Sequence, residues 1–97
     1  MKHARLLPWS EPDGSPCRLE ADEGSSLMLL ADELEAAQLS MALTVLDSTK
    51  RYLRHEQVPA VELRYLANQL AIALSDVVRV AQSRGERLAV ADDESPS

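Results

Sequence analysis

The sequence predicts an all-α protein: an antiparallel two-helix hairpin that follows an irregular N-terminal arm and dimerises into a four-helix bundle. Leu, Ala and Val supply most of its apolar residues, and it has no Phe and one Trp, a composition that suits close-packed helices. Two long stretches, 26–54 and 59–84, repeat apolar residues at helical spacing. Only residues 55–58 connect them, so the two helices are expected to lie antiparallel.

Residues 1–24 form an arm that a helix cannot span, because prolines recur along it. These are Pro8, Pro12 and Pro16. The segment Glu11-Pro12-Asp13-Gly14 is typical of a turn. We expect an irregular arm that packs its apolar side chains on the helices, namely Leu6, Leu7, Trp9 and Leu19. A short hairpin that pairs residues 6–9 with residues 17–19 is the alternative.

Local signals set the boundaries of the helical domain, which is expected to cover residues 25–90. Ser25 and Ser26 offer a hydroxyl N-cap to the first helix, and Pro59 suits the first position of the second helix. Gly85 is expected to end that helix. The acidic residues 91–97 are expected to form a disordered tail.

The first helix has an apolar arc of roughly 200°, about twice the width of an ordinary amphipathic stripe. One neighbouring helix cannot cover such an arc, and each large apolar side chain left in water costs about 1.5–3 kcal/mol. A second copy is the simplest cover, and a different helical partner is the alternative. The expected dimer interface is formed by Leu34, Gln38, Met41, Val45, Leu39 and Leu46.

Gln38 is a polar residue near the centre of this arc. A buried amide needs hydrogen-bond partners, and a core polar residue in a bundle often fixes register and oligomeric state. Gln38→Leu is therefore predicted to raise the melting temperature and loosen the assembly. Partial exposure and a ligand-binding role are the alternatives.

A second surface is expected to bind another protein. It consists of Val61, Tyr65 and Ile72, which are spaced by four and seven residues, together with Trp9. The competing interpretation is that these side chains are buried under the arm or in the dimer. A third surface is a basic patch at the closed end of the hairpin, formed by Lys50, Arg51, Arg54 and Arg64.

The sequence offers only weak candidates for catalytic or metal-binding residues, and the chain is expected not to be an enzyme. Neither His3 nor His55 has a second ligand at metal-binding spacing, so no metal or other cofactor is expected. Arg18 is expected to lower the pKa of Cys17 slightly, but no catalytic partner for the thiol is evident.

Clustered carboxylates invite comparison with helical nucleotide hydrolases, which hold Mg²⁺ between two helices. Asp32, Glu33 and Glu35 scatter over different faces, and Glu62 and Asp76 lie far apart along the second helix. A solvated first turn that favours the helix dipole explains these residues better.

Charge and hydropathy limit the partners and the location. The net charge of −6 argues against nucleic acid as a partner. The sequence has no apolar run long enough to cross a membrane and no secretory signal. With a single cysteine it cannot form an internal disulfide. A cytoplasmic location is expected.

Two segments, Pro8 to Cys17 and Ala81 to Leu88, carry a resemblance. They are similar to the corresponding parts of small uncharacterised helical proteins of high-GC actinomycetes, a group with no assigned activity. The resemblance covers most of the chain and implies no function.

From the residues, we expect a non-enzymatic helical module for protein–protein interaction or regulation that acts as a homodimer. The alternative is a nucleic-acid-associated accessory factor that uses the basic patch at the hairpin turn.

Overall fold

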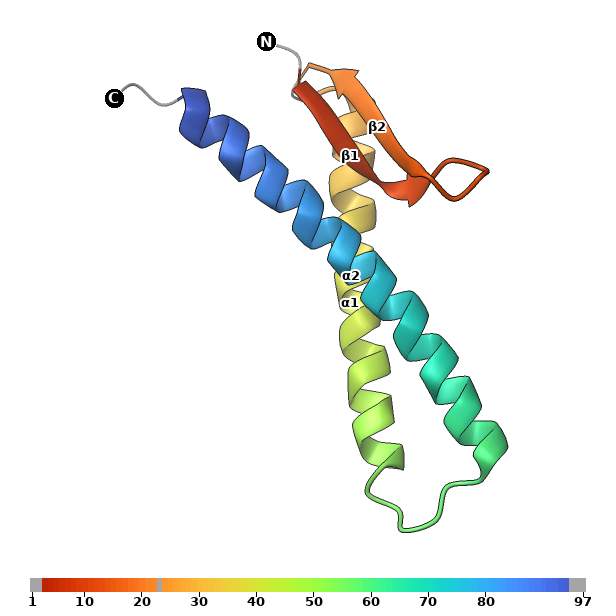
Figure 1. Cartoon of the computed structure of the whole chain (residues 1–97). Coiled ribbons are helices and arrows are strands. Elements are labelled where there is room, and N and C mark those ends of the chain that lie inside the picture. Colours follow the sequence, from red (N-terminus) through yellow and green to blue (C-terminus); the bar gives the residue numbers. More distant parts are fainter. Residues whose placement is uncertain (1–2, 23, 95–97) are drawn as a thin grey trace.

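The computed structural model describes residues 3–22 and 24–94. Two strands, β1 (His3–Ser10) and β2 (Pro16–Ala21), precede two helices, α1 (Ser26–Tyr52) and α2 (Ala60–Glu94). The helices run antiparallel and cross, and the sheet lies at the end where the start of α1 and the end of α2 diverge (Figure 1). The protein is therefore α+β.

The predicted all-α fold class is wrong, because the N-terminal arm forms a two-stranded antiparallel sheet instead of an irregular segment. The alternative hairpin is the one that forms. Its turn is closed by the amide of Gly14, which donates to the carbonyl of Glu11 over 2.8 Å, and Gly14 takes the left-handed φ of 86° that a glycine tolerates. Pro8 is accommodated because an edge strand needs no amide donor on its outer side.

β1 lies between the diverging parts of the two helices and forms the centre of the core. Successive strand residues point to opposite faces, and both Leu6 and Leu7 are buried. An isolated two-stranded hairpin is marginally stable in water, so this hairpin depends on its packing against α1 and α2. The buried apolar side chains are Leu6, Leu7, Met28, Ala31, Leu66 and Val80.

Side chains of both helices bind the backbone of β1. Ser83 Oγ on α2 donates to the carbonyl oxygen of Leu6 over 2.9 Å, and Gln38 Nε2 on α1 donates to that of Pro8 over 2.7 Å. These bonds satisfy carbonyl groups that face away from β2, which fixes the depth of the strand between the helices.

α1 begins close to where the sequence predicts. The Ser25 hydroxyl caps the helix by accepting a hydrogen bond from the amide of Met28. α1 ends at Tyr52 with Lys50 and Arg51 in its last turn, where cations suit the negative end of the helix dipole.

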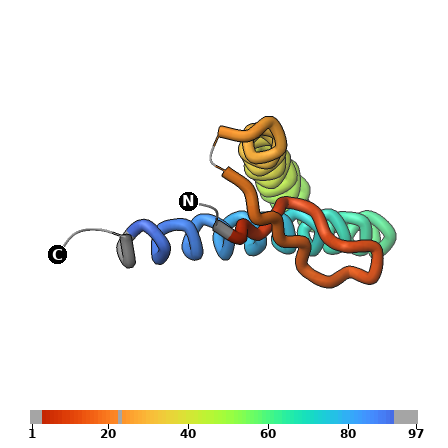
Figure 2. The backbone as a smooth tube through the Cα atoms, turned by 90° about the horizontal axis from the view of Figure 1, so that it is seen from above, coloured from red at the N-terminus to blue at the C-terminus, as the bar shows by residue number. Residues whose placement is uncertain are grey.

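α2 continues past Gly85, the expected end, to Glu94, so residues 91–94 of the expected tail belong to this helix. The remainder of that tail, residues 95–97, lies outside the described residues. The end of α2 extends beyond the sheet (Figure 2). Two residues just after Gly85 hold the extra turns in place, because Glu86 pairs with Arg18 and Arg87 pairs with Glu35.

Gly85→Ala is expected to stabilise the protein by about 0.5–1 kcal/mol, since glycine inside a helix carries that entropic cost relative to alanine. The added Cβ meets nothing within 4 Å. The midpoint of urea unfolding should rise with an unchanged m-value. Gly14→Ala is the matched control and should destabilise, because its φ is positive.

Candidate interaction surface

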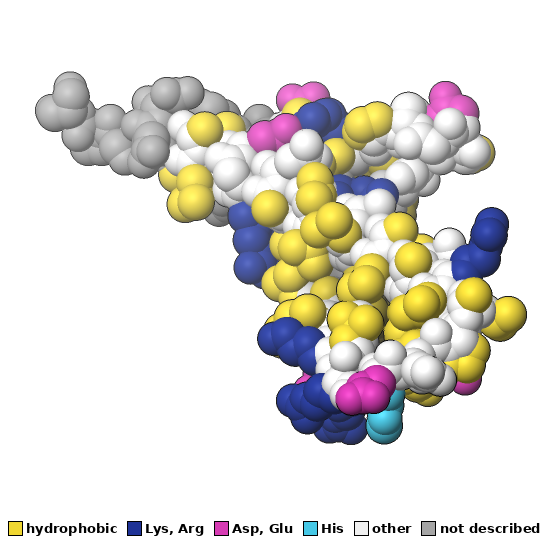
Figure 3. Space-filling view, turned by 60° about the horizontal axis from the view of Figure 1, so that its bottom comes forward, with side chains coloured by type: hydrophobic (Ala, Val, Ile, Leu, Met, Phe, Trp, Pro, Cys, Tyr) yellow, Lys and Arg dark blue, Asp and Glu magenta, His cyan; other side chains and the backbone are white. Residues whose placement is uncertain are grey.

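Large apolar side chains cover both helices and remain exposed, far more of them than are buried. On the face that Figure 3 shows, hydrophobic side chains lie along both helices. The exposed large apolar side chains are Leu27, Leu29, Leu30, Leu34, Met41, Leu43, Leu46, Tyr52 and Leu53 on or next to α1, and Val61, Leu63, Tyr65, Leu70, Ile72, Leu74, Val78 and Leu88 on α2.

On α1 the exposed apolar residues form stripes at helical spacing. One stripe follows steps of three, four and seven residues through Leu27, Leu30, Leu34 and Met41. Such steps return to the same face of a helix, so these side chains present one continuous apolar row. The packing of α2 and the sheet leaves the row in water, with Met41 68% exposed.

The residues predicted to form the dimer interface are spread over more than one side of α1. Leu34 and Met41 belong to this row and are exposed, and the half-buried Val45 lies beside it. At 100° per residue, the half-buried Leu39 and the exposed Leu46 lie on another side of the helix. The dimer remains a prediction, and the sixth residue, Gln38, is turned toward its own chain.

Gln38 binds β1 of its own chain instead of facing outward. Its amide nitrogen donates to the Pro8 carbonyl, and its Oε1 is buried without a hydrogen-bond partner among the described residues. Its polar group thus joins α1 to the sheet, a contact between residues 30 positions apart that no local sequence pattern indicates.

The predicted partner-binding residues on α2 are open to solvent. Val61, Tyr65 and Ile72 are 81%, 63% and 59% exposed, whereas Trp9 in β1 is half-buried. The arm does not cover Val61, Tyr65 and Ile72, as the competing interpretation expected. Its residues Leu6 and Leu7 are buried in the core around β1 instead.

The basic patch also remains on the surface near the connection between the helices, where Figure 3 shows Lys and Arg side chains together. Its members Lys50, Arg51, Arg54 and Arg64 are all exposed. One of the four is partly neutralised, since Arg51 Nη2 lies 2.9 Å from Asp47 Oδ2.

A buried ionic cluster, which the sequence did not reveal, holds the sheet between the helices. Glu35 on α1 is 2% exposed, and its Oε1 lies 3.1 Å from Arg87 Nη2 of α2. Its Oε2 lies 3.3 Å from Nη2 of Arg5, a β1 residue that is 7% exposed. Arg5 Nη2 also lies 2.7 Å from Oδ1 of the exposed Asp32. Three elements therefore meet at one carboxylate.

The position of Glu35 contained a signal that could have identified it. Glu35 follows Met28 by seven residues and Ala31 by four, so it shares the face of α1 that these buried residues occupy. A carboxylate on a buried face requires a cation as its partner. That partner comes from residues distant in the sequence, Arg5 and Arg87, which no local pattern links to Glu35.

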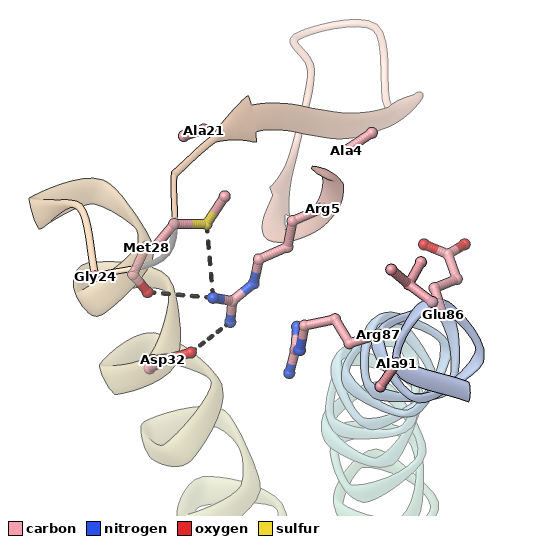
Figure 4. A pocket seen from close by; sticks show the side chains of 10 residues that line it. Ala4, Arg5, Ala21, Gly24, Met28, Asp32, Glu86, Arg87 and Ala91 are labelled. Carbon is pink, nitrogen blue, oxygen red and sulfur yellow. Dashed lines mark hydrogen bonds and ion pairs between the residues drawn. The ribbon is translucent and has the colours of Figure 1, made fainter. Parts of the chain in front are cut away.

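Beside this cluster is a cavity of about 340 Å³ between the sheet, the start of α1 and the last turns of α2. Figure 4 shows the Arg5 side chain directed toward Met28 and Asp32 of α1, while Arg87 extends from α2 on the other side. Arg5 pairs with Asp32, Arg87 with Glu35, and Glu86 with Arg18. Among the described residues that line the cavity, each of the four charged side chains, Arg5, Asp32, Glu86 and Arg87, thus already has an ion-pair partner.

Cys17 is not an activated thiol. Burial raises its pKa, and the nearby Glu11 raises it further. Arg18, expected to lower that pKa, instead forms a two-point ion pair with Glu86 on α2, with nitrogen–oxygen distances of 2.6 and 3.0 Å. The hydrogen bonds from Arg18 lower the pKa of Glu86.

Within the part of the chain that the structure describes, no three His, Cys, Asp or Glu side chains gather as metal ligands. The side chain of His3 lies outside the described part. Among the described helices, none is both long and apolar enough to span a membrane.

Comparison with known proteins gave no match to a family model, to a curated protein or to a solved structure.

Proposed function

We propose that the protein is a non-catalytic protein–protein interaction module that acts as a homodimer through the apolar surface of α1 and α2. The main support for this proposal is the large solvent-accessible surface area of the chain. It exposes 7277 Å², whereas a compact monomer of its mass exposes about 5,500 Å². Its radius of gyration is 17.2 Å, against about 12.5 Å for a compact domain of this length.

The excess area suits an interface between two copies. It amounts to roughly 1,800 Å² per chain relative to a compact monomer. Two chains that each covered this area would bury roughly 3,600 Å² in total, within the range of permanent homodimers. Much of the exposed surface consists of Leu, Val, Ile and Met side chains, which are typical of such interfaces.

The charges on α1 favour an antiparallel contact between the α1 helices of two copies. Glu33 lies in its first third and Lys50 lies at its end. Their neighbours Asp32 and Arg51 already pair with Arg5 and Asp47 of the same chain. A two-fold axis near Met41 would bring opposite charges together at both ends of the contact. Exposed pairs contribute about 0–1 kcal/mol each, so they support the orientation more than the affinity.

We favour this function over a nucleic-acid accessory factor because of charge. The chain carries a net charge of −6, and the exposed basic patch includes an arginine already paired with Asp47. A cytoplasmic location is part of the proposal and is supported by the single free cysteine, Cys17.

Met41→Lys should weaken the dimer by about a hundredfold or more. The two-fold axis places two buried lysines in one contact, and a buried, unpaired charge costs several kcal/mol. Sedimentation velocity at low micromolar concentration should show a dimer for the wild type and a monomer for the variant.

Ser40→Lys is the matched control, because it adds the same charge at the neighbouring exposed position and should leave the dimer intact. A monomeric wild type at these concentrations would reject self-association and leave a different protein as the cover for this surface.

A further inference from the structure

β2 leaves one backbone edge uncovered on the outer side of the sheet (Figure 1). The hydrogen bonds of β1 show which backbone N–H and C=O groups of the sheet point toward the partner strand and which point away from it. The carbonyl groups of Leu6 and Pro8 accept hydrogen bonds from Ser83 and Gln38, so they point away from β2. Along an antiparallel pair, the N–H and C=O groups of alternate residues point toward the partner strand. The backbone groups of Arg5 therefore face β2, and those of Leu6 face away from it.

The same alternation assigns the groups on β2. Arg18 lies opposite Leu6 and Glu20 lies opposite Ala4. The N–H and C=O groups of Arg18 and Glu20 therefore point outward, away from β1. Neither residue has a backbone hydrogen bond to another element in the described ranges. An edge with open donors and acceptors is a template for another strand.

We propose that this edge pairs with the same edge of a second copy, antiparallel about a two-fold axis at Leu19, so that two hairpins form a four-stranded sheet. The axis places Leu19 opposite the partner's Leu19 and Arg18 opposite the partner's Glu20. Each Arg18–Glu20 pair then exchanges two backbone hydrogen bonds, which is the arrangement that the outward groups require.

The side chains select this register. It places Arg18, which also pairs with Glu86 of its own chain, opposite the partner's Glu20 at two symmetric positions, and opposite charges at facing positions stabilise a strand pair. A shift by two residues in one direction would place Arg18 opposite the partner's Arg18. A shift the other way would place Glu20 opposite the partner's Glu20. On the other face of the sheet, the half-buried Leu19 would meet its copy and be covered.

The strand contact uses a different part of the chain from the apolar surface of α1 and α2. The assembly expected for the wild type combines both contacts and therefore rests on the proposed homodimer. Two different two-fold contacts on one chain build assemblies larger than a dimer, closing as a tetramer where the axes cross. The strand contact is small, so it should be the weaker of the two. The wild type should be a dimer at low micromolar concentration and larger near millimolar concentration.

Glu20→Pro tests the edge directly. Proline removes the outward N–H that the partner strand needs, while the hydrogen bonds to β1 use other residues. Sedimentation near millimolar concentration should show the wild type and Glu20→Ala beyond a dimer, and Glu20→Pro held at a dimer. Trp9 fluorescence checks that the hairpin is intact. Should the proline disturb it, Glu20→Lys serves as a second variant, which should weaken the contact roughly tenfold because the new lysine would face the partner's Arg18.

Amide exchange gives a readout specific to the strand. The amides of Arg18 and Glu20 should become protected as concentration rises, whereas the Leu19 amide, which faces β1, should be protected throughout. Protection of Arg18 and Glu20 that does not depend on concentration would overturn the proposal. So would a wild type and a Glu20→Pro variant that are both dimers near millimolar concentration, because the strand edge then adds nothing to the assembly.

The two contacts can fail independently, and Met41→Lys separates them. Near millimolar concentration, Met41→Lys alone should form a dimer through β2, and Met41→Lys with Glu20→Pro should be a monomer. A monomeric Glu20→Pro, together with a Met41→Lys variant that assembles like the wild type, would support the strand contact and contradict the helix dimer. If Met41→Lys alone is monomeric at that concentration, the strand contact fails.

Discussion

Glu35→Ala is expected to lower the free energy of unfolding by about 3–5 kcal/mol, the cost of removing one partner from a buried ion pair. Glu35 is 2% exposed and lies within ion-pair distance of Arg5 and Arg87. Without it, the buried guanidinium of Arg5 keeps only the exposed Asp32 as a counter-charge. The total free energy of unfolding of a small domain is about 5–15 kcal/mol, so the variant should be close to unfolding.

The measurement is urea unfolding followed by far-UV circular dichroism at one fixed protein concentration, because self-association shifts apparent stability. Asp32→Ala is the matched control. It removes the other carboxylate near Arg5, but from a side chain that is 58% exposed, and should cost about 1 kcal/mol or less. Equal losses in both variants would show that burial does not set the strength of this cluster.

A double variant separates the charge from the packing. Arg5→Met with Glu35→Leu replaces the buried pair by apolar side chains of similar size, a change that is often neutral or stabilising. Arg87 is 36% exposed and can turn toward water. The double variant should therefore recover most of the stability that Glu35→Ala loses. Failure to recover would assign a packing role to the Glu35 side chain.

Leu6→Ala is expected to cost about 2–5 kcal/mol, since it opens a cavity in the core. Leu6 is 4% exposed at the centre of the strand that both helices contact. The change leaves the Leu6 carbonyl and its bond from Ser83 in place, so it tests packing and not hydrogen bonding. The loss should release the hairpin, which is not stable by itself.

Thermal unfolding followed by Trp9 fluorescence and by circular dichroism would measure this effect. Leu88→Ala is the control, because that side chain is 68% exposed and should change stability by less than about 0.5 kcal/mol. If Leu6→Ala unfolds no more easily than Leu88→Ala, the sheet does not contribute to the core.

The two helices could be predicted from the sequence because their signals are local. Apolar residues recur at helical spacing, and the residue type of Ser25 is enough to indicate the cap. The end of α2 could not be placed correctly from Gly85, because the residues that extend the helix, Glu86 and Arg87, bind partners far away in the sequence. Glycine is a weak stop signal when tertiary contacts offset its cost of about 1 kcal/mol.

The sequence favours an irregular arm over the hairpin for a related reason. The turn residues are recognisable, but an isolated hairpin is marginal and Pro8 argues against a paired strand. The structure places Pro8 so that its carbonyl faces Gln38 of α1. The helices supply the stability that the local sequence lacks.

By itself, the sequence determined the two helices, the N-cap of the first, and an apolar circumference wider than one neighbour covers. These depend on residues a few positions apart, whose interactions follow from helix geometry. Tertiary structure alone decided that the arm is a sheet, that Gln38 serves β1, and that Glu35 joins Arg5 to Arg87. Each of these contacts joins residues far apart in the chain, and their free energy appears only when the helices and the strand meet.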